Sequence, residues 1–447
     1  MVVGILLVFI IGYAFIALEG VTKVNKSGVA LLMSVVCWSL YMIGNNIQGS
    51  AEVAEVFSGH VASTCETILF LMGAMTIVEV IDSNGGFNFV TDRLHSGSPV
   101  ALLWKTVVLT FFLSALLDNM TTCIVMIMVL RRLVCSKSLR LLYAGIVILA
   151  ANAGGAFSPI GDVTTIMLWI KGCVTTEGII GSLFLPSLVN AVLPALILTF
   201  ILRRKNIRIA PIDSACNNQA DVGTARFEKL FPRESRILIF CIGLFGLMFV
   251  PVFRELTGLP PFVGVMGVLA VLWIVTEVMI YRDKNLLKVE EKIRVSSIIK
   301  KIDISTILFF LGILLTVGAL QETGMLGQFG TWLNDSFHNP YLINSSIGIL
   351  SSVVDNVPLV ASAMGMYDIQ PAGTIGEMAA YCQDGTFWEL LAYCAGTGGS
   401  LLIIGSAAGV VTMGLENITF GWYLKNFTLL ALAGYIGGII TYSFLSV

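Results

Sequence analysis

Two aspartate–asparagine pairs stand inside long apolar stretches of this sequence. Asp118–Asn119 lies within FFLSALLDNMTT at 111–122, and Asp355–Asn356 lies within GILSSVVDNVPLV at 348–360. A carboxylate inside a hydrocarbon-compatible segment costs about 3 kcal/mol even on insertion scales, and such residues usually serve a function. Two pairs in matching surroundings therefore indicate one paired site.

Each pair offers oxygen atoms of the kind that hard cations prefer. If the chain turns back at the pair, the tip has backbone carbonyls without helical partners, which are tolerated only inside protein or along a cavity. The side-chain oxygens of each pair, with Ser114 or Ser351 nearby, would complete a cation-binding cluster. The alternative is that each aspartate only caps a half-helix.

Polar, glycine-rich interruptions follow both pairs. The hydrophobic segment at 141–170 is interrupted at 152–162, and the segment at 386–414 is interrupted at 395–406. Glycine, proline and small polar residues suit a crossing helix that is broken half-way. Close packing of intact helices through small residues is the alternative. The predicted broken-helix residues are Asn152, Gly154, Gly155, Ser158, Thr397, Gly398, Gly399 and Ser400.

Asp162 is a further acid within the first interruption. Thr164 and Thr165 follow it. Its carboxylate would serve either the cation site or the start of a helix, and the sequence leaves both roles open.

The composition is that of a polytopic membrane protein. The chain has 447 residues, of which 56% are hydrophobic and 12% charged; soluble domains carry about 25% charged residues. The net charge of −2 gives no reason to expect a nucleic-acid partner. Nine scattered cysteines without a CxxC motif indicate neither a disulfide framework nor a zinc site. We therefore expect an all-α polytopic membrane protein that holds no cofactor and is not an enzyme.

Apolar segments long enough to cross a bilayer recur along the whole chain. They fall near 1–18, 28–48, 66–82, 141–170, 179–202, 235–253, 262–281, 304–322, 386–414 and 427–445, and 100–130 and 341–366 carry the Asp–Asn pairs.

The two halves of the chain resemble each other. TILFLMG at 67–73 matches TILFFLG at 306–312 at an offset of 239, and the Asp–Asn pairs lie 237 apart. Such duplication is typical of secondary transporters. We predict repeats at 1–202 and 235–447, joined by a cytoplasmic linker at 203–234.

Basic residues predict how the repeats are oriented. If 100–130 enters the membrane and returns, every Lys and Arg except Lys171 and Arg254 falls on the cytoplasmic side. Each repeat then has five transmembrane segments plus one re-entrant hairpin, at 100–130 and 341–366. Five crossings invert the second repeat relative to the first and leave both termini outside.

The charge census of the core favours a cation as the substrate. The predicted core contains aspartates but no Lys or Arg. A proton and a metal cation would compete for the same carboxylate oxygens, and this competition is sufficient for antiport if access alternates.

At these residues the sequence resembles the NhaD-type sodium/proton antiporters of the ion transporter superfamily. The resemblance covers essentially the whole chain and is carried by five long stretches. These are FLMGAMTIVEVID at 70–82, FFLSALLDNMTT at 111–122, AANAGGAFSPIGDVTTIMLWIKG at 150–172, DNVPLVASAMGMY at 355–367 and GTGGSLLIIGSAAGVVTMG at 396–414.

The resemblance implies Na⁺(Li⁺)/H⁺ exchange across the bacterial inner membrane. It also implies a homodimer in the lipid bilayer, whose hairpin-bearing domains slide against a scaffold. By the same resemblance, each Asp–Asn pair and the break that follows it would form one Na⁺ site. The expected cation- and proton-binding residues are Ser114, Asp118, Asn119, Thr121, Asp162, Ser351, Asp355 and Asn356.

Two rival functions stay open at this point. A sodium-coupled dicarboxylate or citrate carrier would share the fold, but the acidic hairpin tips disfavour an anionic substrate. A passive cation channel would not need duplicated, inverted halves with broken helices.

Overall fold

The structure, a computed structural model, describes most of the chain. The described residues are 1–17, 22, 24–44, 50–86, 94, 98–204, 233–282, 295–302, 304–337, 339–353 and 356–446. Every named element among them is a helix, and a single isolated bridge joins Gln370 to Cys382. The predicted linker at 203–234 lies almost wholly outside the described residues.

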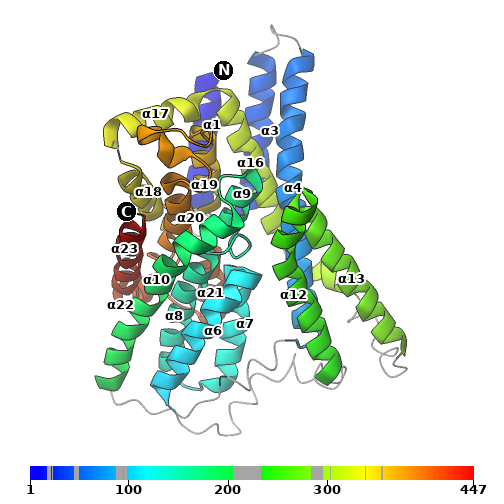
Figure 1. Ribbon diagram of the computed structural model, residues 1–447, viewed down its shortest axis with the longest axis vertical. Coiled ribbons are helices and arrows are strands. Elements are labelled where there is room, and N and C mark those ends of the chain that lie inside the picture. The colour runs from blue at the N-terminus through cyan, green and yellow to red at the C-terminus, as the bar shows by residue number, and fades with distance from the viewer. Residues whose placement is uncertain are drawn as a thin grey trace.

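The helices of the first half run from the N-terminus to Arg204 (Figure 1). They are α1 (Val2–Ala17), α3 (Lys26–Gly44), α4 (Ser50–Ser83), α6 (Pro99–Leu117), α7 (Asn119–Leu133), α8 (Lys137–Ala156), α9 (Val163–Lys171) and α10 (Thr176–Arg204). The helices of the second half follow from Arg233. They are α12 (Arg233–Thr257), α13 (Pro261–Arg282), α15 (Val295–Ile298), η2 (Ile299–Lys301), α16 (Ile304–Glu322), α17 (Met325–Phe337), α18 (Pro340–Leu350), α19 (Asn356–Met366), η3 (Gly376–Tyr381), α20 (Thr386–Gly398), α21 (Ala407–Glu416), α22 (Phe420–Asn426) and α23 (Thr428–Leu445).

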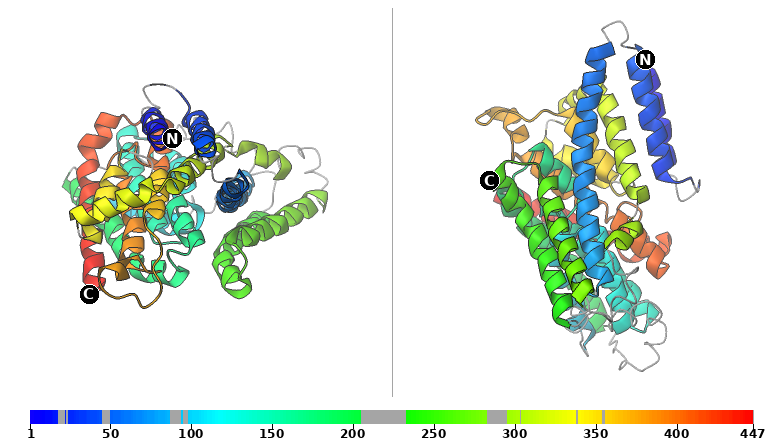
Figure 2. Two further views of the ribbon diagram at one scale, coloured as in Figure 1. Left: turned by 90° about the horizontal axis from the view of Figure 1, so that it is seen from above. Right: turned by 90° about the vertical axis from the view of Figure 1, so that its right-hand side faces the viewer.

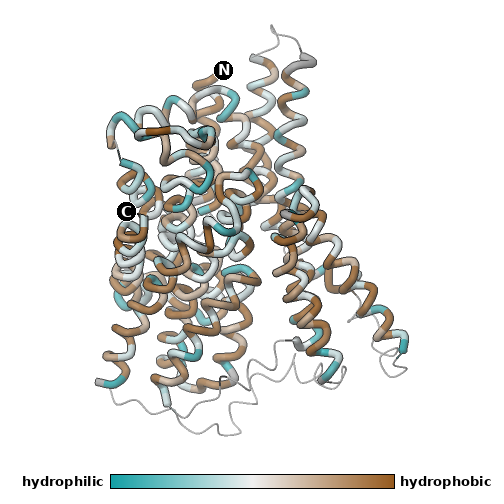
Figure 3. Tube along the Cα trace, in the orientation of Figure 1, coloured by the Kyte–Doolittle hydropathy of each residue, from teal (hydrophilic) through white to brown (hydrophobic). Residues whose placement is uncertain are grey.

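Long apolar helices with apolar outer surfaces confirm the predicted fold class. Within the described residues, nine helices are long and apolar enough to cross a membrane. Large apolar side chains on these helices are exposed, as Phe245 on α12 and Ile274 on α13 illustrate at 62% and 64% exposure. Hydrophobic residues predominate along α12 and α13 (Figure 3). Hydrocarbon solvates such a surface, whereas water does not. The chain is an all-α polytopic membrane protein.

Some helix boundaries differ from those predicted. The segment expected at 66–82 is the second part of α4, a helix of 34 residues. The first part of α4 contains many polar residues, so the apolar run that predicts the helix covers only its second part. The apolar runs of the sequence did not predict α17, because this helix is amphipathic. One face is buried at Leu326, and the other carries the exposed Trp332.

The helices fall into two groups by their contacts. One group contains α1, α3, α4, α12, α13 and α16, and the other contains α6 to α10 and α18 to α23. Seen from above, α13 stands apart from the second group (Figure 2). Contacts of α4 with α9, α12 with α6, and α16 with α19 connect the groups. We call the first group the frame and the second the core group.

The two Asp–Asn segments lie toward opposite ends of the molecule. α6 is long enough to cross a membrane, yet α7 returns beside it, since α6 and α7 contact each other and both contact α8. Figure 1 places α6 and α7 near the end where α10 stops, and α18 and α19 toward the end that holds α17. We call the latter the α17 end.

Several local geometries recur at the offsets found in the sequence. Gly85 and Gly324, 239 residues apart, have φ angles of 71° and 73°. Their N–H groups donate to the backbone carbonyls of Asp82 and Gln321 at 2.8 and 2.9 Å. A left-handed glycine after a helix satisfies the last carbonyls, so α4 and α16 end in the same way.

The hairpin helices pack against the broken helices in matched ways. Ser114 Oγ donates to the Ala151 carbonyl at 2.6 Å, and Ser351 Oγ donates to the Ala395 carbonyl at 2.9 Å. Beside these bonds, Gly154 packs on the Phe111 carbonyl and Gly398 packs on the Gly348 carbonyl. These close approaches fix the hairpins against α8 and α20.

Alanine at Gly154 or Gly398 is therefore expected to destabilise the protein. A Cβ at either position would overlap a backbone carbonyl, which cannot rotate away. We expect a loss of about 1–3 kcal/mol or more, measured as a lower Tm of the purified protein in detergent. Gly414→Ala on α21 is the control, because nothing lies within 4 Å of its Cβ position. Equal Tm values for all three variants would contradict this packing.

Candidate functional site

Asp118 forms the turn between α6 and α7. It ends α6 and caps α7, and its φ of 128° is unusual for a residue other than glycine. Its Oδ1 accepts from the Thr121 N–H and its Oδ2 from the Thr121 hydroxyl, both at 2.7 Å. The carboxylate thus faces the start of its own helix, and these bonds hold the unusual backbone in place.

Asn119 turns toward the first helix break. Its side-chain amide donates to Asp162 Oδ2 at 2.5 Å and to Asn152 Oδ1 at 3.1 Å. The side chain is buried, with 7% exposure. The hairpin tip is therefore joined to both sides of the break between α8 and α9.

Asp162 caps the half-helix that follows the break. Its Oδ1 accepts from the Thr164 N–H at 2.9 Å and the Thr164 hydroxyl at 3.0 Å, and Thr165 completes a capping box. Only 2% of the residue is exposed. The N-terminal dipole of α9 and these donors stabilise negative charge on the carboxylate. Oδ2 is directed toward the hairpin tip.

Asn152 connects the two halves of the chain. Its amide nitrogen donates to the hydroxyls of Ser400 and Ser406 at 2.7 and 3.0 Å. Ser406 also caps α21 by accepting from the Gly409 N–H at 3.1 Å. Both helix breaks therefore meet at one amide.

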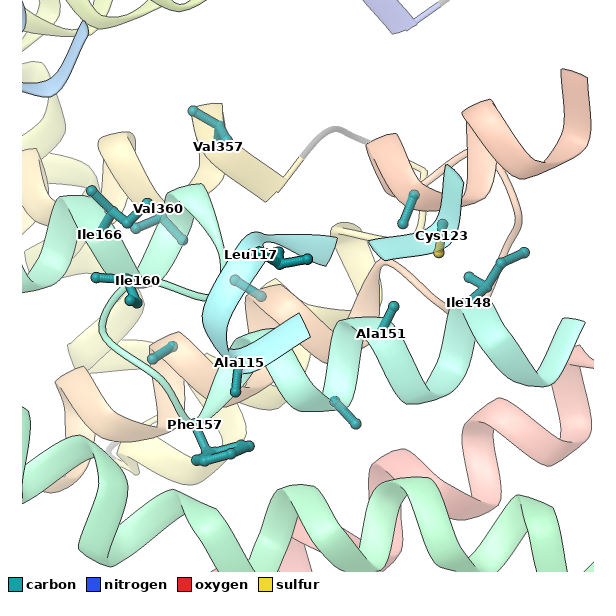
Figure 4. Close-up of a cluster of buried hydrophobic side chains, with 14 of the residues drawn as sticks. Ala115, Leu117, Cys123, Ile148, Ala151, Phe157, Ile160, Ile166, Val357 and Val360 are labelled. Carbon is teal, nitrogen blue, oxygen red and sulfur yellow. The ribbon is translucent and has the colours of Figure 1, made fainter. Parts of the chain in front are cut away.

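These side chains form one buried cluster, which we call the central polar network. Its members are Asn119, Asn152, Asp162, Ser400 and Ser406. The helices of the core group carry a cluster of buried apolar side chains, which includes Leu117 of α6, Ala151 of α8, Ile166 of α9 and Val360 of α19 (Figure 4). Carboxylate, amide and hydroxyl oxygens are ligands that suit a hard cation, and the apolar surroundings make any uncompensated charge costly.

Other predicted site residues hold the backbone instead of joining the network. Ser158 Oγ donates to the Ala115 carbonyl at 2.5 Å, and Thr397 Oγ1 donates to the Tyr393 carbonyl at 2.6 Å. Ser158, Ser114 and Ser351 thereby join the hairpin helices to the helix breaks, whereas the Thr397 bond lies within α20. Thr121 serves the cap of α7.

The second hairpin is only partly described. Asn356 is the first residue of α19 and is buried at 5% exposure. Asp355 lies outside the described residues.

Both breaks begin later than the sequence predicts. α8 continues through Asn152, Gly154 and Gly155 to Ala156, and α20 includes Thr397 and Gly398. The irregular segments are 157–162 and 399–406, which contain Ser158, Gly399 and Ser400. A glycine can stay helical where close packing holds its backbone. Here the Phe111 carbonyl packs against Gly154, and the Gly348 carbonyl packs against Gly398. Pro159, which restricts the preceding residue, stands within the first break.

Ser406 is the network residue that sequence reasoning missed. It lies 244 residues after Asp162, the same offset that relates Gly154 to Gly398. The two residues occupy equivalent capping positions at the starts of α9 and α21. Extending the repeat alignment by eight residues would have identified it.

A second buried acid, Glu416, lies at the end of α21 and forms ion pairs within the core group. Glu416 is 2% exposed, and its oxygens bind Arg131 Nε at 2.6 Å and Arg140 Nε at 2.7 Å. The cluster joins the ends of α7 and α21 to the start of α8. Because two guanidinium groups compensate its charge, this carboxylate is structural.

Comparison with known proteins places this architecture in a family. The CitMHS family model, described as citrate transporter, matches residues 7–382. Sodium/proton antiporter 2 of Arabidopsis thaliana is 41% identical over 98% of this chain and 98% of its own length. The chain belongs to the NhaD-type antiporters of the ion transporter superfamily.

Two further relatives span nearly the whole chain. Sodium/proton antiporter 1 of Arabidopsis thaliana is 43% identical over 98% of this chain and 72% of its own length. The Na(+)/H(+) antiporter NhaD of Vibrio cholerae is 32% identical over 99% of this chain and 91% of its own length.

Replacing Asp162 with asparagine removes the one titratable side chain of the central polar network. We expect Na⁺ and Li⁺ to raise the Tm of the wild-type protein but not of Asp162→Asn. A ligand that binds only the folded state stabilises it by about 2.7 kcal/mol at 100 times its Kd, so the effect is measurable by thermal shift in detergent.

Asp384→Asn is the matched control for this experiment. The Asp384 carboxylate also accepts from a threonine N–H and hydroxyl, those of Thr175, at 2.6 and 2.8 Å. It lies outside the central polar network, so its replacement should leave the Na⁺ effect intact. Equal stabilisation of Asp162→Asn by Na⁺ would contradict the assignment.

Proposed function

We propose that the protein exchanges Na⁺, and also Li⁺, for H⁺ across the membrane by alternating access. The observation that supports this most is the central polar network, in which Asn119 and Asn152 link the Asp162 carboxylate of the first helix break to the Ser400 and Ser406 hydroxyls of the second. The segments 106–130, 141–170 and 303–424, which supply these residues, contain no Lys or Arg. The names of the relatives, sodium/proton antiporters, agree with this function.

Competition for one carboxylate would couple the two ions. When Asp162 is ionised, its Oδ2 can bind Na⁺ together with amide and hydroxyl oxygens of the network. When Asp162 is protonated, that negative charge is lost and Na⁺ binds weakly. Both occupied forms are neutral, whereas the empty, ionised form carries a buried charge and is the costly one to move across the membrane. Exchange follows if only the neutral forms change sides.

The hairpin acids belong to the proposed site as well. Asp118 precedes Asn119, whose amide contacts Asp162, and the Asp118 cap sets the direction of that amide. We infer that Asp118, with Ser114 and Thr121, mainly positions the first hairpin. Asp355 and Asn356, with Ser351, would form the corresponding part of the second.

The proposal includes two inverted repeats and a moving core group. The repeats are 1–202 and 235–447, with re-entrant hairpins from α6–α7 and α18–α19. The core group would slide against the frame, and two copies would form a homodimer through their frames. The distribution of basic residues supports an orientation with both termini outside, and the similarity to a bacterial NhaD antiporter supports a multi-pass location in a bacterial inner membrane.

One specific observation favours a second candidate function. The matching family model is described as citrate transporter, so a sodium-coupled carrier of citrate or dicarboxylates is the alternative. The Asp162 carboxylate would repel such a substrate. Uptake of labelled citrate or succinate into proteoliposomes, driven by Na⁺, would favour the carrier; its absence alongside Na⁺/H⁺ exchange would exclude it.

Substitution of the aspartates separates exchange from positioning. In everted vesicles, Asp162→Asn is expected to reduce Na⁺-induced collapse of the pH gradient at least tenfold at every pH, because the exchangeable charge is gone. Asp118→Asn retains a good helix cap, so it should lower the rate while leaving the pH profile in place. The same substitution at Asp355 tests the second hairpin.

Conservative variants control for folding in this experiment. Asp162→Glu keeps the charge and should retain some exchange with a higher KM for Na⁺, and Asp384→Asn, which lies outside the central polar network, should keep the wild-type KM for Na⁺. Normal antiport with an unchanged pH profile in Asp162→Asn would contradict the proposed mechanism.

A further inference from the structure

A buried carboxyl group lies outside the central polar network, at the α17 end of α20. Glu389, in the first turn of α20, is only 7% exposed. The Tyr442 hydroxyl of α23 donates to its Oε2 at 2.5 Å. The proposed exchange does not use this group, and no sequence motif points to it.

The surroundings of Glu389 contain no positive charge among the described residues. The groups that face it are Tyr442 from α23, Ser182 from α10 and Asp384 from the segment before α20. No described Lys, Arg or His lies within ion-pair distance of its carboxyl. Glu416, the other deeply buried glutamate, binds two arginines instead.

The presence or absence of a neighbouring cation affects whether a buried carboxyl group is stable with or without its proton. An ionised carboxylate in an apolar interior needs a compensating cation, and without one the group takes up a proton. Glu416 has two guanidinium partners that compensate its charge. Glu389 has a hydroxyl donor and a neighbouring acid, so the neutral form is the one that this environment accommodates.

Glu389 also lies between a surface cavity and the network. A cavity of about 370 Å³ at the α17 end is lined by residues that include Tyr341, Asp384 and Thr386, one helical turn before Glu389. The centroids of the Tyr341 and Tyr442 rings lie 6.2 Å apart. In the other direction along α20, Gly396 is about 10 Å away on the same helix face, and its Cβ position is 3.9 Å from Asp162 Oδ2.

We propose that Glu389 is a second proton-binding site, which holds a proton in this conformation and exchanges it with water in the cavity at the α17 end. Oε2 shares a hydrogen bond with the Tyr442 hydroxyl in this site. Its role in transport rests on the proposed antiport: the occupancy of Glu389 sets how exchange depends on pH at the side that this cavity faces. The protonation itself does not depend on that function.

Infrared difference spectroscopy tests the protonation directly. The purified full-length protein in detergent at neutral pH is compared with Glu389→Gln and with Glu416→Gln. We expect Glu389→Gln to lose a protonated-carboxyl C=O band that shifts in D₂O, and Tyr442→Phe to move that band. Glu416→Gln should instead lose carboxylate bands. An unchanged C=O region in Glu389→Gln would overturn the proposal.

Transport from each side tests the role. In oriented proteoliposomes, Glu389→Gln should flatten the pH dependence measured from the α17 side, with the profile from the other side unchanged. A wild-type profile from both sides would overturn this role. If the wild-type protein shows the C=O band but no Na⁺/H⁺ exchange under any condition, the proposed function fails while the proton site stands.

Discussion

The central constraint on this protein is that helices end inside the membrane-embedded core. A helix that stops there leaves N–H and C=O groups without partners, and hydrocarbon cannot satisfy them. At the start of α9, Asp162 accepts from the backbone and the hydroxyl of Thr164, and at the start of α21, Ser406 accepts from Gly409. Both of these capping side chains are members of the central polar network.

The two equivalent caps differ in one important respect. Asp162 and Ser406 occupy corresponding positions, but only the first can carry charge. Asn152 connects them through the Ser406 hydroxyl and accepts from Asn119, which in turn contacts Asp162. The central polar network thus combines one acidic side chain with neutral polar side chains from both halves of the chain. This asymmetry is what we would expect of a site that alternates between a proton and one monovalent cation.

Packing confines the site as strongly as hydrogen bonding does. Gly154 and Gly398 lie directly against hairpin carbonyls, and Ser114 and Ser351 bond the neighbouring carbonyls of α8 and α20. Each hairpin is thereby fixed to the helix whose break it faces. Motion of the core group against the frame would leave these contacts intact.

Much of this arrangement could be predicted from the sequence. Its composition gave the fold class, and the intramembrane acids pointed to the region of the site. The roles of the acids could not be predicted, because Asp118 and Asp162 both precede a threonine by three residues, a spacing that suits a helix cap. Only the three-dimensional arrangement distinguishes Asp118, which bonds Thr121 with both oxygens, from Asp162, which directs one oxygen at Asn119.

The positions of the breaks were likewise beyond the sequence. Glycine permits a break but does not require one, and the tight contacts of Gly154 and Gly398 with the hairpins keep both residues helical. Glu389 escaped notice because an acid near the end of an apolar segment resembles an ordinary interfacial residue. Its burial depends on α10 and α23, which are distant in sequence.

Proton release on cation binding tests the central claim most directly. NaCl is added to the purified protein in weakly buffered detergent solution, and the pH is recorded against choline chloride as a control. The account predicts that wild-type protein releases protons as Na⁺ binds, with none from Asp162→Asn. Sodium binding to the wild type without proton release, or equal release from Asp162→Asn, would contradict competition at this carboxylate.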